Sequence, residues 1–287
     1  MTGKNLSGDV IAVAVAGTLV VLLMIAGCLG NEGGAATSPS QQITVTGSTT
    51  VLPIAERAKE AFEAKDASAA IMVSGGGSSV GIKAVGEGTA DIGMASRDLK
   101  PEETAGYPDI VRHEIASDAI LLIVNQENIV ESLTLDKVRG IYNGTYTAWD
   151  QVGGPDQPIV VIGRDSASGT REFFSEYVLK KEDFVKTQEE FNSNGGIQQK
   201  VSRTPGAIGY VGLGYTDAVK PLALDVNGTI IEPTLENVSS GLYPISRPLF
   251  MLTSGEPEGL VQQYLEFIMS DEGQEIVASL DYIPVWR

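Results

Sequence analysis

The segment Ile159-Val-Val-Ile-Gly-Arg-Asp-Ser-Ala-Ser-Gly-Thr170 places an apolar run directly before a stretch of small polar residues. The run from Ile159 to Ile162 is typical of a β-strand buried on both faces. From Thr170 to about Leu179 the apolar residues fall on one face of a helix; they are Phe173, Phe174, Tyr177 and Val178. The small polar residues therefore lie where a strand passes into a helix.

The same order of elements occurs twice nearer the N-terminus. The first set is a strand at 43–45, a small polar segment at 47–50 and a helix at 53–65. The second set is a strand at 70–73, a small polar segment at 76–79 and a helix that follows this segment and ends at Val85. Further strands are expected at 90–94 and 119–124. Strands that alternate with helices predict an α/β fold with mainly parallel sheets.

Each of the three polar segments precedes the start of a helix, where backbone N–H groups lack partners and carry partial positive charge. Serine and threonine at such a point can cap the helix or direct hydroxyl groups at a ligand, and glycine lets the backbone come close. Each segment alone is also compatible with an ordinary strand-to-helix turn. If the three converge, they form a dry anion site made of N–H and O–H groups.

Two charged residues lie next to these segments. Arg164 would supply a planar, permanently charged group for oxyanion oxygens; the alternative is a surface ion pair with Asp165. Asp98 follows the turn after the strand at 90–94 and is the candidate acceptor for a proton on the ligand. Such an acceptor would favour hydrogen phosphate over sulfate, which has no proton to donate.

Composition excludes several classes of function. The chain has 37 acidic and 20 basic residues and a net charge of −17, which argues against a nucleic-acid partner. A single cysteine and a single histidine argue against a disulfide framework and a metal centre, so neither metal nor cofactor is expected. In a nucleotide-binding loop, lysine and then serine or threonine follow the second glycine directly, whereas Gly81 is followed by Ile82 and Lys83. His113 is the only possible histidine base. An enzyme is therefore not expected.

The first residues have the features of an export signal. Lys4 precedes an apolar run from Val10 to Ala26, which ends in small residues before the lone Cys28. This arrangement resembles the lipobox of exported lipoproteins and predicts a signal peptide at 1–27, a lipid on Cys28 and a flexible tether at 28–41. The alternative is an uncleaved membrane anchor. Both place the rest of the chain outside the cytoplasm, anchored at the outer face of the cell membrane.

Several segments, in this order, resemble the substrate-binding protein of the phosphate-specific ABC transporter. The most specific are 164–170 and Thr204-Pro-Gly-Ala-Ile-Gly-Tyr-Val211; the others are 47–53, 77–79, 91–96, 141–144 and 149–150. The resemblance implies a two-lobed periplasmic-binding-protein fold of type II, each lobe a mixed sheet flanked by helices, closing around inorganic phosphate by a two-strand hinge. It implies lobe 1 at 42–122 and 247–287 and lobe 2 at 123–246, with crossings near Ile123 and Arg247 where segments 119–124 and 248–252 lie side by side. The implied partners are phosphate and the permease subunits of the transporter, and we expect a monomer.

The resemblance also implies the binding residues. Large members of the family have an aspartate directly after the serine that ends the third segment, whereas Arg97 stands here between Ser96 and Asp98. The proton acceptor is then Asp98, or its role is reorganised around Ser96 and Arg97. The expected phosphate contacts are Ser48, Thr49, Thr50, Ser78, Ser96, Arg97, Asp98, Arg164, Ser168, Gly169 and Thr170. The alternatives are a binding protein for sulfate, molybdate or tungstate, and a phosphate sensor or adhesion protein of the same fold.

Overall fold

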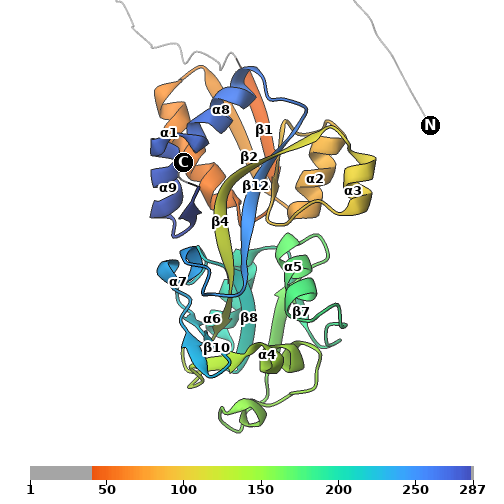
Figure 1. Cartoon of the computed structure of the whole chain (residues 1–287), viewed down its shortest axis with the longest axis vertical. Coiled ribbons are helices and arrows are strands. Elements are labelled where there is room, and N and C mark those ends of the chain that lie inside the picture. Colours follow the sequence, from red (N-terminus) through yellow and green to blue (C-terminus); the bar gives the residue numbers. More distant parts are fainter. Residues whose placement is uncertain (1–40, 286–287) are drawn as a thin grey trace, which may run out of the picture. The chain divides into compact units, whose positions relative to one another are not determined.

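Two antiparallel strands, β4 (Ile110–Val124) and β12 (Ser246–Ser254), link the two halves of the described chain (Figure 1). The computed structural model describes residues 41–285. β4 pairs with β12 over residues 110–119, where Asp118 lies opposite Arg247. It then pairs with β8 (Ala207–Gly212) over residues 120–124. One strand therefore belongs to both halves, and we call the halves lobe 1 and lobe 2.

Lobe 1 contains the N-terminal part of the described chain and its C-terminal part. Its strands β1, β2 and β3 are parallel, and β12 joins β3 in the antiparallel sense. From Ile43 on, the side chains of β1 alternate between buried and partly exposed positions, because successive side chains of a strand point to opposite faces of the sheet. The bounds are β1 (Gln41–Gly47), α1 (Leu52–Lys65), β2 (Ala69–Gly75), α2 (Ser78–Gly86), β3 (Ile92–Ala95), α3 (Pro101–Gly106), α8 (Gly259–Met269), α9 (Asp271–Ser279) and β13 (Ile283–Pro284).

Lobe 2 is the central part of the chain, inserted between β4 and β12. Here β6 pairs in parallel with β8 and with β7, so the main sheet has the order β2-β1-β3-β12-β4-β8-β6-β7. A second sheet has the order β11-β10-β5. The bounds are β5 (Ser132–Thr134), α4 (Leu135–Tyr142), the 3-10 helix η1 (Trp149–Val152), β6 (Val160–Arg164), α5 (Gly169–Tyr177), β7 (Glu189–Phe191), α6 (Asn194–Arg203), β9 (Lys220–Pro221), β10 (Ala223–Val226), β11 (Thr229–Ile231) and α7 (Leu235–Ser239).

Each lobe has its own hydrophobic core. In lobe 1, Ile54 and Phe62 of α1 pack with Tyr264 of α8 against the sheet. In lobe 2, Phe174 of α5 stacks on Tyr210 of β8, with ring centroids 4.2 Å apart and planes inclined by 8°. Aromatic stacking and burial of this kind hold a helix firmly to its sheet. The start of α5 is thereby fixed relative to β6 and β8.

The predicted α/β fold with mixed sheets is confirmed, but the crossing between the lobes differs in detail from the expectation. Residues 120–124 lie beside β8, and together with Ala119 they belong to the core of lobe 2. The segment beside 248–252 is 112–117 of β4. The pairing partner of β4 changes from β12 to β8 between Ala119 and Ile120. The lobe boundaries at 122/123 and 246/247 remain a prediction. The sequence of β4 is apolar on both sides of this point, so hydrophobicity alone does not mark where its partner changes.

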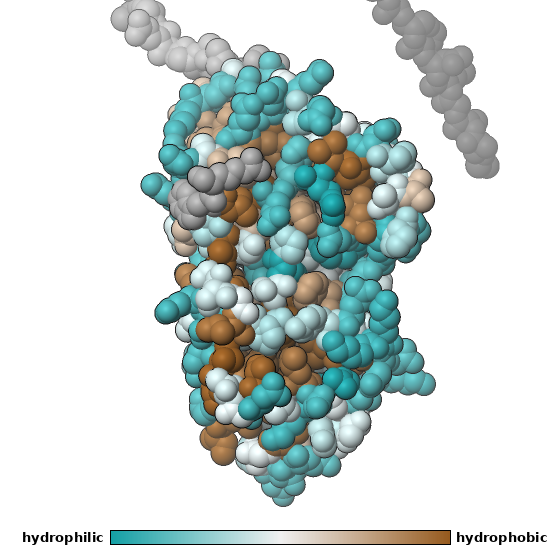
Figure 2. Space-filling model, viewed as in Figure 1, coloured by the Kyte–Doolittle hydropathy of each residue, from teal (hydrophilic) through white to brown (hydrophobic). Residues whose placement is uncertain are grey.

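The predictions for residues 1–40, including the signal peptide, Cys28 and nearly all of the tether, fall outside the described residues. Within residues 41–285, no helix has the length and apolar character needed to cross a bilayer. Figure 2 shows that hydrophilic residues cover much of the visible face and that hydrophobic residues also show in patches on it.

Candidate anion-binding site

The three small polar segments lie against one another. The first two are joined by a hydrogen bond from the Gly77 amide to the Gly47 carbonyl (2.8 Å), and the second meets the third where Ser79 donates its N–H to the Ala167 carbonyl (3.1 Å). Across the lobes, the hydroxyl oxygens of Thr50 and Thr170 are 3.3 Å apart. In this structure the lobes are therefore closed onto each other at these loops.

Glycines make this close approach possible. Gly77 has φ of +100°, a conformation that other residues rarely adopt, and a Cβ there would lie 2.5 Å from the Ala167 carbonyl oxygen. A Cβ on Gly169 would lie 2.3 Å from the Ser78 hydroxyl. Side chains at either position would push the two lobes apart.

Nearly all the residues that the sequence predicted for the site are buried here. Burial of hydroxyl groups and a guanidinium is costly unless hydrogen bonds compensate. Ser168 caps α5 by accepting from the Arg171 amide, and Ser78 accepts from the Ser96 amide. The residues that are at most 6% exposed are Ser48, Thr49, Thr50, Ser78, Ser96, Arg97, Arg164, Ser168 and Thr170, and Gly169 is also buried.

Arg164 is the buried cation of lobe 2. Its Nε donates to the Phe191 carbonyl (3.3 Å) and its Nη2 to the Asn192 carbonyl (3.1 Å), while within the described chain Nη1 has no partner. Burial lowers the pKa of the guanidinium to about 10, so it keeps its charge at neutral pH. The alternative of a surface ion pair with Asp165 is wrong, because Arg164 is only 1% exposed and forms no such bridge among residues 41–285.

Asp98 does not join the site. Its side chain is 68% exposed and forms an ion pair with Arg112 on the surface of lobe 1. The expectation that it accepts the ligand's proton therefore has no support in the geometry. The turn after β3 directs Ser96 and Arg97 inward, and the next residue consequently faces solvent.

Arg97 is buried, and both of its terminal nitrogens already donate hydrogen bonds within the protein. Nη1 donates to the Asp98 carbonyl and to Glu103, and Nη2 donates to Ser79 and to Glu103. Nε forms an ion pair of 2.8 Å with Glu172 of lobe 2. Burial alone would lower the pKa of Arg97, but Glu103 and Glu172 outweigh it and raise the pKa. Arg97 therefore connects the lobes through its ion pairs with Glu103 and Glu172. Its Nη1 and Nη2 are fully engaged, so the contact with phosphate that the sequence predicted for it has no support in these hydrogen bonds.

Three further buried residues complete the site, and the sequence did not predict any of them as a site residue. Asn194, at the start of α6, donates through Nδ2 to the hydroxyls of Thr49 (3.3 Å) and Thr50 (3.0 Å). Arg247 donates through Nη2 to the hydroxyls of Thr50 (3.3 Å) and Thr170 (3.0 Å). The side chains of Arg247 and its ion-pair partner Asp118 are both 0% exposed.

Signals for these residues exist in the sequence. Asp118 is a charged residue at the start of a long apolar run, and a charge at such a position needs a buried partner. Asn194 follows the same order of strand, small polar segment and helix as the other three loops. The strand before it, Glu189–Phe191, is short and acidic, so it does not look like a buried strand.

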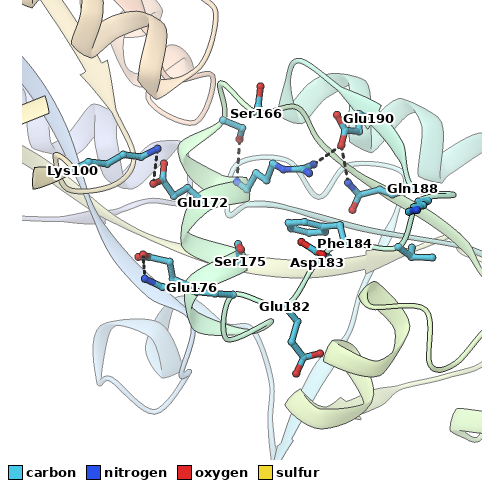
Figure 3. Close-up of a pocket in the computed structure, with 15 residues that line it drawn as sticks. Lys100, Ser166, Glu172, Ser175, Glu176, Glu182, Asp183, Phe184, Gln188 and Glu190 are labelled. Atoms are coloured by element: carbon cyan, nitrogen blue, oxygen red, sulfur yellow. Dashed lines mark hydrogen bonds and ion pairs between the residues drawn. The ribbon is translucent and has the colours of Figure 1, made fainter. Parts of the chain in front are cut away.

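A hollow of about 650 Å³ lies along α5, as Figure 3 shows, and Ser166 and Ser168 of the third polar segment are among the residues that line it. Three of its cations are paired with carboxylates: Lys100 with Glu172 (2.9 Å), Arg171 with Glu190 (2.7 Å) and Lys181 with Glu176 (3.2 Å). The paired charges leave little positive potential there for an anion. Among residues 41–285, no cluster of three or more histidine, cysteine, aspartate or glutamate side chains could hold a metal ion.

Two lobes that share a sheet and enclose buried donors define the class of two-lobed binding proteins. Residues 33–272 match the family described as the PBP superfamily domain. The Bacillus subtilis phosphate-binding protein PstS is 31% identical over 278 residues, which is 93% of this chain and 92% of that protein. PstS of Borreliella burgdorferi is 35% identical over 257 residues, 85% of this chain and 90% of the relative.

Solved structures agree with the sequence relatives. A Clostridium perfringens protein with bound phosphate, assigned as the substrate-binding protein of a phosphate ABC transporter, has a TM-score of 0.81 and 38% identity and covers 86% of this chain and 100% of its own. An ABC-type phosphate transport receptor from Vibrio cholerae has a TM-score of 0.69 and 31% identity, with coverages of 84% and 99%. The chain belongs to the PBP superfamily and, within it, to the family of PstS phosphate-binding proteins.

Replacing Arg247 by methionine should lower the free energy of unfolding by about 3–5 kcal/mol, because it leaves Asp118 as an unpaired buried charge. Urea unfolding followed by circular dichroism measures the change. The matched control is Arg57→Met, which removes an exposed ion pair with Glu60 and should cost less than about 1 kcal/mol. Equal costs for the two variants would show that the buried pair does not stabilise the lobe crossing.

Proposed function

We propose that this chain is the extracytoplasmic phosphate-binding component of an ABC importer, which captures inorganic phosphate between its lobes and delivers it to a membrane permease. The observation that carries the proposal is the meeting of the three polar loops with the buried guanidinium of Arg164. Hydroxyls of Thr49, Thr50, Ser78, Ser168 and Thr170, together with the N–H groups at the start of α5, form a set of donors suited to a tetrahedral oxyanion. The names of the relatives support phosphate as that anion.

Lobe closure suits this role. Ligand contacts come from both lobes, so the ligand is fully held only when the lobes meet, and binding proteins of this shape close by a hinge. The Arg97–Glu172 pair and the Lys100–Glu172 pair (2.9 Å) cross the same seam and stabilise the closed state. We propose that β4 and β12 at Asp118 and Arg247 form the hinge.

Titration calorimetry tests the choice of anion. We expect tight phosphate binding and sulfate binding weaker by at least about a hundredfold, roughly 3 kcal/mol. Molybdate and tungstate serve as further competitors. Equal affinities for phosphate and sulfate would contradict the phosphate assignment and favour a binding protein for another oxyanion.

Arg164→Ala should weaken phosphate binding by about 2 kcal/mol, roughly thirtyfold in Kd, because charge-assisted bonds in a desolvated site are strong. The control is His113→Ala, whose imidazole contacts the Thr253 hydroxyl at 2.9 Å in lobe 1 and should leave Kd unchanged. Calorimetry on both variants gives the comparison. The reverse result, with a larger loss for His113→Ala, would place the ligand elsewhere.

Location and anchoring belong to the same proposal. A binding protein that feeds an importer works outside the cytoplasm, and the lipobox-like segment before Cys28 would hold it at the membrane by a lipid. We therefore propose a lipidated Cys28 as the first mature residue, a monomeric body and no catalytic activity, so a chromogenic phosphate ester should not be turned over.

Mass spectrometry of the N-terminus of the exported protein tests the anchor. The expected product starts at Cys28 and carries acyl chains, and Cys28→Ala should abolish both the cleavage and the added mass. A mature protein that still contains residues 1–27 would show that the apolar run remains as a membrane anchor instead.

A further inference from the structure

Four buried polar atoms at or next to the site form no hydrogen bond within the described chain: Arg97 Nε, Asp165 Oδ1, Asn194 Oδ1 and Arg247 Nη1. Arg97 Nε still has an ion-pair partner in Glu172, and two of the others, Asn194 Oδ1 and Arg247 Nη1, belong to groups that contact Thr50. The Asn194 residue is 0% exposed and Arg247 is 3% exposed. An unpaired buried polar atom is strongly disfavoured, so each such atom in a folded protein calls for an explanation, such as a bound ion or water. One of the two is an acceptor and the other is a charged donor.

Both atoms lie next to the same hydroxyl. Asn194 Nδ2 donates to Thr50 Oγ1 at 3.0 Å, and Arg247 Nη2 donates to the same oxygen at 3.3 Å. Each unpaired atom shares a carbon with one of these nitrogens. The unpaired acceptor and the unpaired donor therefore both belong to groups that meet at Thr50, where the two lobes come together.

The hydrogen-bond pattern fixes how the threonines act. A hydroxyl has one donor hydrogen and two acceptor lone pairs. Thr50 Oγ1 already accepts from Asn194 and Arg247, so its own hydrogen must point to another acceptor, either Thr170 or a ligand. Thr170 likewise accepts from Arg247. The threonines are thus arranged to donate, and they leave the site without an acceptor of their own.

The neighbouring carboxylates are occupied elsewhere. Oδ2 of Asp118 accepts from Nε and Nη2 of Arg247, and its Oδ1 accepts from the Leu213 amide. Glu172 is engaged by Arg97 and Lys100, and Asp98 faces solvent. Among the described residues, two buried oxygens near the polar loops have no hydrogen-bond partner, Asn194 Oδ1 and Asp165 Oδ1. Asn194 Oδ1 is the one whose amide group also contacts Thr50, where the two lobes meet.

We propose that Asn194 Oδ1 accepts the hydrogen bond from the protonated oxygen of hydrogen phosphate, while Arg247 Nη1 donates to one of its ionised oxygens. The inference rests on the proposed function and assigns the residue that sets specificity within that site. A protonated oxyanion satisfies both unpaired atoms. Sulfate, which has no O–H at neutral pH, would satisfy Arg247 but leave the amide oxygen unpaired.

The test compares phosphate and sulfate affinities by calorimetry for the wild-type protein, Asn194→Leu and Asn194→Asp. Loss of the acceptor in Asn194→Leu should weaken phosphate binding more than sulfate binding and lower the ratio of their affinities by about tenfold or more. Asn194→Asp keeps an acceptor and should retain the preference for phosphate. The matched control is Gln199→Leu, which replaces an exposed amide on the same helix and should leave the ratio unchanged.

The outcomes separate this inference from the proposed function. A wild-type protein that does not bind phosphate would overturn the proposed function itself. If the wild type binds phosphate and Asn194→Leu weakens both anions by the same factor, Asn194 only supports the threonines and the inference is wrong. An Asn194→Asp variant that loses the preference for phosphate would also overturn it.

Discussion

The buried ion pair between Asp118 and Arg247 lies where the two lobes join, and the site depends on it. The two residues face each other across β4 and β12, and Arg247 Nη2 is 2.8 Å from Asp118 Oδ2. Burial raises the pKa of the Asp118 carboxyl, and Arg247 with the Leu213 amide opposes this shift. The same guanidinium contacts Thr50 of lobe 1 and Thr170 of lobe 2. One pair of side chains therefore connects the strand crossing to the hydroxyls of both lobes.

Around this pair, hydrogen bonds and close backbone contacts hold the first polar loop against both lobes. Tyr215 of lobe 2 donates to the Thr49 carbonyl at 2.6 Å, and Tyr282 of lobe 1 donates to the Thr50 carbonyl at 2.8 Å. These bonds fix the backbone of the first loop from both sides. Gly169 then lets the start of α5 reach Ser78. Within each lobe the geometry of the donors is set by the fold, so closure of the lobes brings together donors that are already oriented.

The sequence predicted the α/β class, the three polar loops and most of the buried hydroxyls, because strand-to-helix turns with small residues leave a local pattern. It did not predict the roles of Asp98 and Arg97, since the direction of a side chain after a turn depends on tertiary packing. Asp98 faces solvent, while Arg97 is taken up by Glu103 and Glu172. Asn194 was not predicted for a different reason. The short strand before it, Glu189–Phe191, is acidic and lacks the apolar pattern by which a buried strand is recognised in a sequence.

The distribution of buried charge explains why a neutral acceptor suits this site. Arg247 is balanced by Asp118, and Arg97 and Lys100 are balanced by Glu103 and Glu172. Arg164 is then the cation of the site without a carboxylate bound to it. A carboxylate as proton acceptor would cancel this single positive charge in a desolvated place, where charges interact strongly. An amide oxygen accepts the same hydrogen bond without a net charge, and it leaves the guanidinium and the helix N-terminus to attract the anion. The net charge of −17 does not oppose this, because exposed charges more than about 8–10 Å away are largely screened by salt.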